Sequence, residues 1–128
     1  MKSAHIRETE RPKISRGGGA STVQMVTPAC GAQAFLSGFT DIPPGGAIPL
    51  HYHNCEESVL ILSGEALVEV DGETFPAKAG EVIWQPQDIP HRFLNVSDEP
   101  LRIFWTYASV EATRTLVETG ETGPILAE

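Results

Sequence analysis

Apolar side chains in this sequence occur in short runs that turn-forming residues separate. The runs have the length of β-strands and are rich in β-branched and aromatic side chains, and no stretch has a convincing helical period. The pattern therefore predicts an all-β protein. We expect strands at residues 23–26, 34–39, 59–62, 66–70, 82–84 and 101–107.

The connections between these runs are turn compositions of glycine, proline, aspartate and serine. Asp71-Gly72 is the clearest, because both central positions of a type I′ hairpin need a positive φ and this pair tolerates it. It predicts an antiparallel hairpin that joins residues 66–70 to residues 73–75. Many short strands with turns about every ten residues indicate a sandwich or a closed barrel. Closure removes bare strand edges, so we expect an antiparallel jelly-roll barrel.

The chain divides into an arm and one domain. Residues 1–16 are charged and without period, and three glycines at 17–19 separate them from the apolar runs. We expect residues 1–19 to form a flexible N-terminal arm and residues 20–128 to form a single barrel, because 128 residues are the size of one ordinary domain.

Charge narrows the choice of partners. Nine basic and 17 acidic side chains give a net charge of −8, which repels nucleic acid and anionic membrane surfaces. No apolar run approaches the roughly 20 residues of a membrane span, and the first residues lack the apolar stretch of a secretory signal. Cys30 and Cys55 form no CxxC pair and are expected to be reduced. We expect a cytoplasmic protein that binds a small molecule.

Three histidines and one glutamate have the spacing of a metal site. Residues two apart on a strand point to one face, so His51, His53 and Glu57 would line one side of a strand through this stretch. Glu56 has the opposite parity and is not the expected ligand unless a bulge intervenes. His91 follows a proline-flanked turn and would arrive from a separate strand. Three imidazole nitrogens and one carboxylate oxygen suit a divalent first-row ion with positions open to water or substrate.

The same residues belong to two motifs that resemble the signature of the cupin family. The first consists of Gly45, His51, His53, Glu57 and Gly64, and the second of Gly80, Pro86, His91 and Asn95. Every spacing in these motifs matches, although Asp88 stands where the second motif usually has glycine, and aspartate also tolerates turn conformations.

The resemblance implies a cupin-type double-stranded β-helix, with its metal motifs at 45–64 and 80–95. It also implies one divalent transition metal ion per chain inside the barrel mouth, held by His51, His53, Glu57 and His91. Iron, manganese, zinc, nickel and copper all suit this donor set, and the sequence does not choose among them.

Other residues near the motifs have two interpretations each. Cys55 shares the ligand parity, but a small buried side chain is expected there rather than a fifth ligand. Gln85 interrupts an apolar strand and lies either in the cavity or on the surface at the strand end. Arg102 is either an anchor for a substrate carboxylate or part of a solvated outer face. His5 lies in the arm and is expected to be solvated. Four aromatic residues form either a cavity wall or plain core: Trp84, Phe93, Trp105 and Tyr107.

The function hypothesis is a metal-dependent oxygenase, specifically a dioxygenase, that acts on a small oxygenated or phenolic compound. The alternatives are a non-catalytic metal-binding or small-ligand module and a Lewis-acid isomerase or lyase. Cupins include all of these activities, so the resemblance does not decide whether the chain is an enzyme, and no proton-transfer residue can be named.

The run at 101–107 predicts a partner subunit. Its alternate residues are apolar on both faces, so the outer face needs a cover from the chain's own terminal segments or from a second copy. We expect a homodimer, the commonest symmetric assembly. Cupin dimers often exchange terminal strands, and either residues 20–26 or residues 113–119 could be exchanged here.

Overall fold

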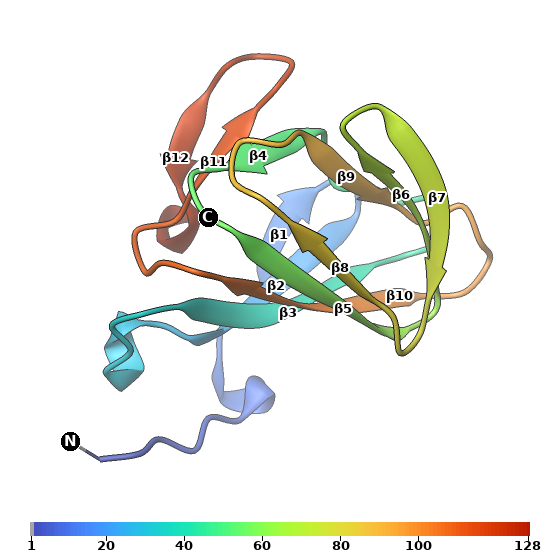
Figure 1. Ribbon diagram of the computed structural model, residues 1–128. Helices are drawn as coiled ribbons and strands as arrows, with labels where there is room; N and C mark the ends of the chain where they lie inside the picture. The colour runs from blue at the N-terminus through green and yellow to red at the C-terminus, as the bar shows by residue number, and fades with distance from the viewer. Residues whose placement is uncertain (1) are drawn as a thin grey trace.

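The computed structural model describes residues 2–128, so Met1 of the expected arm lies outside it. Twelve strands form two six-stranded antiparallel sheets (Figure 1). The strands are β1 (Ile14–Gly17), β2 (Ala20–Val26), β3 (Leu36–Ile42), β4 (His51–His53), β5 (Glu57–Ser63), β6 (Glu65–Val70), β7 (Glu73–Lys78), β8 (Val82–Gln85), β9 (His91–Leu94), β10 (Leu101–Tyr107), β11 (Thr113–Leu116) and β12 (Thr122–Pro124). Three short 3₁₀ turns complete the regular structure: η1 (Glu8–Glu10), η2 (Pro28–Cys30) and η3 (Ile125–Ala127). No helix within residues 2–128 is long and apolar enough to cross a membrane.

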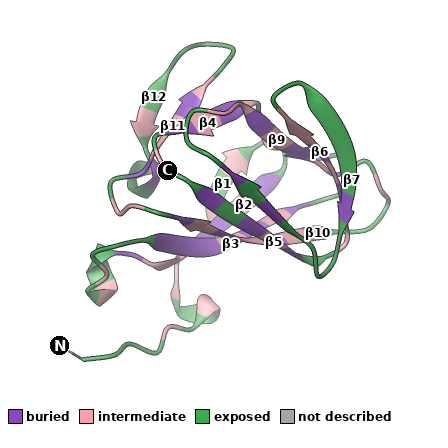
Figure 2. Cartoon of the chain, in the orientation of Figure 1, coloured by how far each residue is buried: buried purple, intermediate pink, exposed green. Residues whose placement is uncertain are grey.

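The two sheets face each other and enclose the core between them. Their orders are β1-β2-β3-β10-β5-β8 and β12-β11-β4-β9-β6-β7. Most buried residues lie on strands, whereas the connecting loops and most of β7 are exposed (Figure 2). On β5 and β10, buried residues alternate with more exposed ones, as expected for strands with one face toward a core. The predicted all-β jelly-roll barrel is confirmed.

The predicted hairpin is also confirmed. β6 pairs with β7 from Glu65↔Lys78 to Val70↔Glu73, and Asp71 and Gly72 between them have φ angles of 52° and 83°. Asp88, which replaces the usual glycine of the second motif, has a φ of 65°. Aspartate tolerates this left-handed conformation better than most residues, so the departure leaves the turn in place.

The boundary of the expected arm at residue 19 is wrong. Residues 14–17 form β1, which pairs with β2 from Ile14↔Thr22 to Gly17↔Ala20. Residues 17–19 are the turn of this hairpin rather than a spacer, and all three glycines have positive φ angles. The strand escaped prediction because backbone pairing with β2 holds it, whereas its side chains are only half-buried or exposed.

Both candidates for an exchanged strand pair within the chain. β2 lies between β1 and β3. The expected strand at 113–119 is shorter, because only Thr113–Leu116 forms β11, and it pairs with β4 on one side and β12 on the other. β11 is therefore a strand of the barrel next to the histidine-bearing strand.

Candidate metal centre

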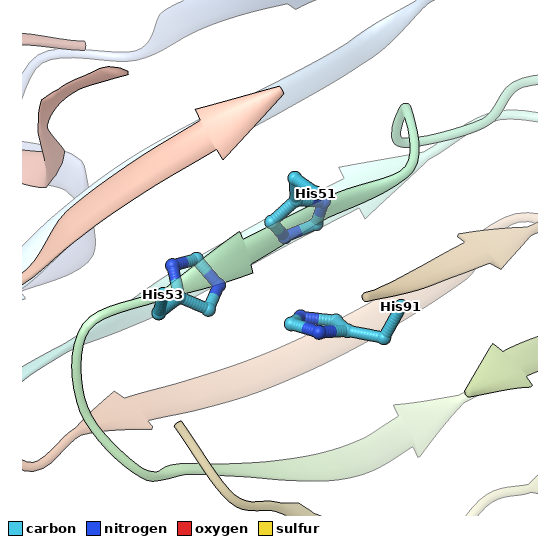
Figure 3. A group of neighbouring side chains, drawn as sticks. All are labelled: His51, His53 and His91. Atoms are coloured by element: carbon cyan, nitrogen blue, oxygen red, sulfur yellow. The ribbon is translucent and has the colours of Figure 1, made fainter. Parts of the chain in front are cut away.

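Three histidine rings meet in the interior between two neighbouring strands. His51 and His53 lie on β4, and His91 opens β9, where it is the direct partner of His51. All three are buried, and their rings point toward one another (Figure 3). One ring nitrogen from each histidine lies within 4.8 Å of the others. The sequence expectation that His91 joins the pair from a separate strand holds in this geometry.

Backbone carbonyls fix which nitrogen of each ring faces the centre. Nδ1 of His51 lies 2.6 Å from the carbonyl oxygen of Pro49, Nδ1 of His53 lies 3.0 Å from that of Thr113, and Nδ1 of His91 lies 2.9 Å from that of Ile89. A carbonyl oxygen only accepts hydrogen bonds, so each Nδ1 must carry and donate the proton. Each neutral ring then presents its Nε2 lone pair to the interior, which is the form that binds a metal ion.

Glu57 reaches the same point from the opposite sheet. The expected continuous strand through His51, His53 and Glu57 is wrong. The chain leaves the second sheet after His53 and enters the first at Glu57, the first residue of β5. Of the two neighbouring acids, Glu57 is buried, whereas Glu56 is exposed and accepts a hydrogen bond from Trp84 Nε1 at 2.9 Å, so Glu57 remains the predicted ligand.

The distances around Glu57 test whether the four residues fit an ion. Its Oε1 lies 3.1 Å from His91 Nε2 and 3.5 Å from His53 Nε2. Within residues 2–128 these three buried atoms have no hydrogen-bond partner, because with Nδ1 protonated they all offer lone pairs. A cation between them satisfies all three. Donor atoms about 2.1 Å from one ion lie about 3.0 to 3.4 Å apart in octahedral or tetrahedral geometry, so the spacing of Glu57 with His53 and His91 suits a divalent ion.

Burial and neighbouring charges keep the donors in binding form. Burial, followed by the proximity of His91 and His53, lowers the pKa of His51 well below its usual value. Burial alone would raise the pKa of Glu57, but the charge and hydrogen bonds of His53 and His91 in their protonated form outweigh it and hold that pKa well below its ordinary range in the metal-free protein. A neutral imidazole and an ionised carboxylate are the protonation states that metal ligation requires.

Polar and aromatic side chains surround the four residues. Tyr107 is the strand partner of Glu57 on β10, and Gln85 is its partner on β8. A cavity of about 20 Å³ touches His51, Glu57, Phe93, Trp105 and Tyr107, enough for roughly one water molecule. Gln85 is 1% exposed, and neither atom of its amide has a hydrogen-bond partner in the described chain. Of the two interpretations of Gln85, the structure therefore supports the interior one.

The structure shows which of the other candidate residues face the cavity. Arg102 lies on the outer face of β10, where it pairs with Asp41 and with Glu8 of the N-terminal segment and stacks on Phe39, so it does not face the cavity. Cys55 is half-buried against the core, and burial raises the pKa of its thiol. His5 is exposed. Among the four aromatic residues, Phe93, Trp105 and Tyr107 line the cavity, whereas Trp84 is 60% exposed.

Sequence reasoning missed a half-buried charge cluster beside the centre. Arg16 of β1 lines the cavity with His51 and Glu57, and its guanidinium Nη1 lies 2.7 Å from Oε2 of Glu128. The other oxygen of Glu128 lies 2.9 Å from Nε of Arg114 on β11. Arg16 stood in the supposed arm, and Arg114 and Glu128 carried no motif, so no pattern linked three residues that are far apart in the chain.

The motif residues outside the centre shape its frame. Gly64 has a φ of 85°, and a Cβ there would lie 2.3 Å from the carbonyl oxygen of Pro100, so no side chain fits. Asn95 is buried, and its Nδ2 donates to the carbonyl oxygens of Ile42 and Glu99 at 2.9 and 2.7 Å. These contacts fix the loop that follows β9, the strand that carries His91.

Comparison with known families agrees with this architecture. The family model described as "Cupin domain" matches residues 38–107, which is more than half of the chain and includes all four candidate ligands. This chain belongs to the cupin family. A curated relative, polyketide synthase CurC of Streptomyces cyaneus, is 34% identical over 125 residues, and the match covers 96% of this chain and 79% of CurC.

Solved structures of other proteins superpose on most of this chain. The polyketide cyclase RemF from Streptomyces resistomycificus aligns with a TM-score of 0.75 at 21% identity, over 98% of this chain and 85% of RemF. A structure of Bacillus subtilis oxalate decarboxylase, studied for its Mn(II) centers, aligns with a TM-score of 0.77 at 25% identity. That match covers 87% of this cupin and 31% of the decarboxylase chain.

Proposed function

We propose that this cupin is a metal-dependent enzyme that acts on a small oxygenated compound of polyketide type, with His51, His53, Glu57 and His91 holding one divalent ion. The observation that carries the proposal is the set of three imidazoles, each with Nδ1 bonded to a backbone carbonyl, whose Nε2 atoms converge with a buried carboxylate. The identity with CurC supports the substrate class, because β-dicarbonyl and phenolic oxygens are the groups that a polyketide offers.

A bound divalent ion would polarise a carbonyl or phenolic oxygen as a Lewis acid and so favour proton loss from the neighbouring carbon. The protein's own residues would orient the substrate. Burial, with the charges of Glu57 and Glu128, raises the pKa of Tyr107 well above its usual value, so its hydroxyl stays protonated and can donate a hydrogen bond. The free amide of Gln85 offers both a donor and an acceptor. Phe93 and Trp105 give the cavity an apolar wall.

A carbon that loses a proton beside a polarised carbonyl can attack a second carbonyl of the same chain, so ring closure is the reaction class that we favour, and oxygenation is the second candidate. Oxygenation is favoured by the donor set, because three imidazoles and one carboxylate also suit redox-active iron or manganese and leave positions open on a six-coordinate ion. The Mn(II) centers named for the Bacillus subtilis decarboxylase belong to that metal class. Both candidates use the same four ligands and differ in whether dioxygen is consumed.

Proton exchange on a simple β-dicarbonyl compound tests the first candidate. Ethyl 2-methylacetoacetate in D₂O exchanges its α-proton, and NMR follows the rate. We expect the zinc- or manganese-loaded protein to accelerate exchange over the metal-free protein, and the His91→Ala variant to lose the acceleration. Equal rates for all three samples would contradict carbonyl activation.

An oxygen electrode tests the second candidate. Catechol added to the iron- or manganese-loaded protein should leave the dioxygen concentration unchanged if the centre is only a Lewis acid. Sustained oxygen uptake that His91→Ala abolishes would replace ring closure with oxygenase chemistry. No response in either assay, with metal bound, would favour the non-catalytic binding module.

We also propose that the protein is a homodimer. Phe39 and Phe104 pack edge to face on the outer side of the first sheet, with ring centroids 5.0 Å apart, and both are only half-buried. The N-terminal segment covers part of this side through the contact of Glu8 with Arg102. Light scattering should give a mass near twice 13.8 kDa. A monomer mass would mean that the N-terminal segment alone covers the outer side of the first sheet.

A further inference from the structure

Two hollows meet at the ion pair between Arg16 and Glu128. The inner hollow is the cavity beside the candidate metal centre, and Arg16 lines it with His51 and Glu57. The outer hollow has a volume of about 210 Å³ and is lined by Arg114 and Glu128. Because Arg16 Nη1 and Glu128 Oε2 are only 2.7 Å apart, this ion pair lies between the outer hollow and the metal cavity.

The arginine at this position is fixed from inside the barrel. Arg16 Nη1 donates to Thr22 Oγ1 at 3.3 Å, and Thr22 shares a hydrogen bond of 2.8 Å with Thr40 Oγ1. The indole Nε1 of Trp105 donates to the same Thr40 oxygen at 2.9 Å. A chain of polar contacts therefore connects the cavity wall at Trp105 to the guanidinium. The Arg16 side chain is 11% exposed, so a charge is held in the interior at a defined place.

Two guanidinium groups meet at one side chain. Arg16 and Arg114 both contact the side-chain carboxylate of Glu128, and Nη1 of Arg114 is buried without a hydrogen-bond partner among the described residues. A planar guanidinium binds a carboxylate most strongly through two parallel hydrogen bonds. Here Arg114 Nε approaches Glu128 Oε1 to 2.9 Å, yet that oxygen and Arg114 Nη1 both lack a hydrogen bond of good geometry among the described residues. The pair can therefore bind a carboxylate from a ligand when Glu128 moves away.

We propose that Arg16 and Arg114 form a binding site for the carboxylate group of the molecule that enters the metal cavity, and that the Glu128 side chain fills this site until the ligand displaces it. The proposal rests on the function proposed above and adds the charge of the ligand. The position of Arg16 in both the ion pair and the cavity wall would place the ligand's anionic end at Arg16 and its reacting part at the metal.

Benzoate titrated into the zinc-loaded protein tests this site, with benzamide as the neutral analogue of the same shape. The chain has two tryptophans, so two indole N–H signals are expected in a ¹⁵N-resolved NMR spectrum. Trp105 bonds to the polar chain that ends at Arg16, whereas Trp84 is exposed on β8 and serves as an internal reference. We expect benzoate to shift the Trp105 signal saturably and to leave the Trp84 signal in place, and benzamide to have no such effect.

Three variants separate the contributions of Glu128 and Arg16 to the benzoate affinity. Removal of the competing carboxylate in Glu128→Gln should raise the benzoate affinity about tenfold, since one charge-assisted contact is worth about that factor. Arg16→Gln should lower the affinity about tenfold or more, and Arg16→Lys, which keeps the charge, should retain part of it. Arg102→Gln is the matched control, because Arg102 also pairs with acids but lies on the outer face, and its benzoate affinity should equal that of the unchanged protein.

Unchanged or weaker benzoate binding in Glu128→Gln, or undiminished binding in Arg16→Gln, would overturn the proposal. Zinc content and the thermal unfolding midpoint of each variant are measured on the same samples, so a misfolded variant is recognised. If Arg16→Gln does not fold, the benzoate affinity of Arg16→Lys tests the role of Arg16 instead. If no variant binds zinc, the metal proposal has failed. The same titration of the metal-free protein still tests the arginine site separately.

Discussion

The two ends of the barrel interior are equally buried and chemically opposite. β5 and β10 pair along their length, and their inward residues form matched layers. At one end Ile61 faces Ile103, and both are almost completely buried among aliphatic neighbours. At the other end, two layers along the same strands, Glu57 faces Tyr107. Both ends have lost their contact with water, but only the first has replaced it with favourable packing.

The difference separates residues that stabilise the fold from residues that make the site. An aliphatic side chain gains free energy when it is buried, whereas a buried polar group costs free energy unless it finds a partner. The polar end holds four side-chain atoms without partners on Gln85, His53 and His91, and a fifth on Glu57, within the described residues. A protein that needed only stability would place apolar residues there, so this end indicates a binding function.

The largest expected effect is the loss of metal affinity when a ligand at the polar end is removed. His91→Ala removes one of the four converging donors, and the affinity for zinc or manganese should fall by more than the roughly 10- to 100-fold seen for lost supporting contacts. Glu57→Gln should also lose metal. The matched controls are His5→Ala and Glu56→Gln, which are exposed and should keep full metal content in elemental analysis. Metal loss in Glu56→Gln with retention in Glu57→Gln would reverse the ligand assignment.

A substitution at the apolar end should lower the stability of the fold and leave metal binding unchanged. Ile61→Ala leaves a cavity in the core and should lower the free energy of unfolding by about 3 kcal/mol, as large-to-small core substitutions do. Its metal content per folded chain should not change. Leu62→Ala, on the same strand but 40% exposed, should have little effect in urea unfolding. An equal loss in both variants would mean that burial does not distinguish these positions.

Acid should destabilise the metal-free protein through the polar end. The pKa of folded His51 is lowered, whereas in the unfolded chain it has its ordinary value of about 6.5. Below that pH the unfolded state binds more protons, so the free energy of unfolding should fall as the pH drops through about 6.5 toward 5. Urea unfolding with a chelator present measures the slope. The slope should decrease in His51→Gln and persist in Ile61→Ala.

The smallest expected effect is a change in the free energy of unfolding when the polar side chain of Gln85 is made apolar. Gln85→Leu replaces an amide without partners by an apolar group of similar size, and should raise the free energy of unfolding by about 1 kcal/mol. Gln87→Leu on the exposed turn is the control and should be neutral. Loss of stability in Gln85→Leu, measured by thermal unfolding, would show that the Gln85 amide does form stabilising hydrogen bonds in the folded protein.

Local pattern predicted those features that depend on neighbours in the chain. The Asp71-Gly72 hairpin followed from the φ angles that two residues tolerate, and the inward parity of His51 and His53 followed from their spacing on one strand. The motif spacings selected the four candidate ligands for the same reason. The continuous strand assumed through residues 51–57 was wrong, because a crossing between sheets at residues 54–56 leaves no mark on the alternation of side chains.

By itself the sequence determined the all-β class, the main strands and the four residues whose spacing suits a metal ion. Only the tertiary structure decided that Gln85 faces inward, that Arg102 faces outward, and that Arg16, Arg114 and Glu128 meet beside the metal cavity. The physical reason is the range of the interactions. Strand alternation and turn geometry act over a few residues, whereas an ion pair between residues 16 and 128 exists only after the sheets have packed and brought distant parts of the chain together.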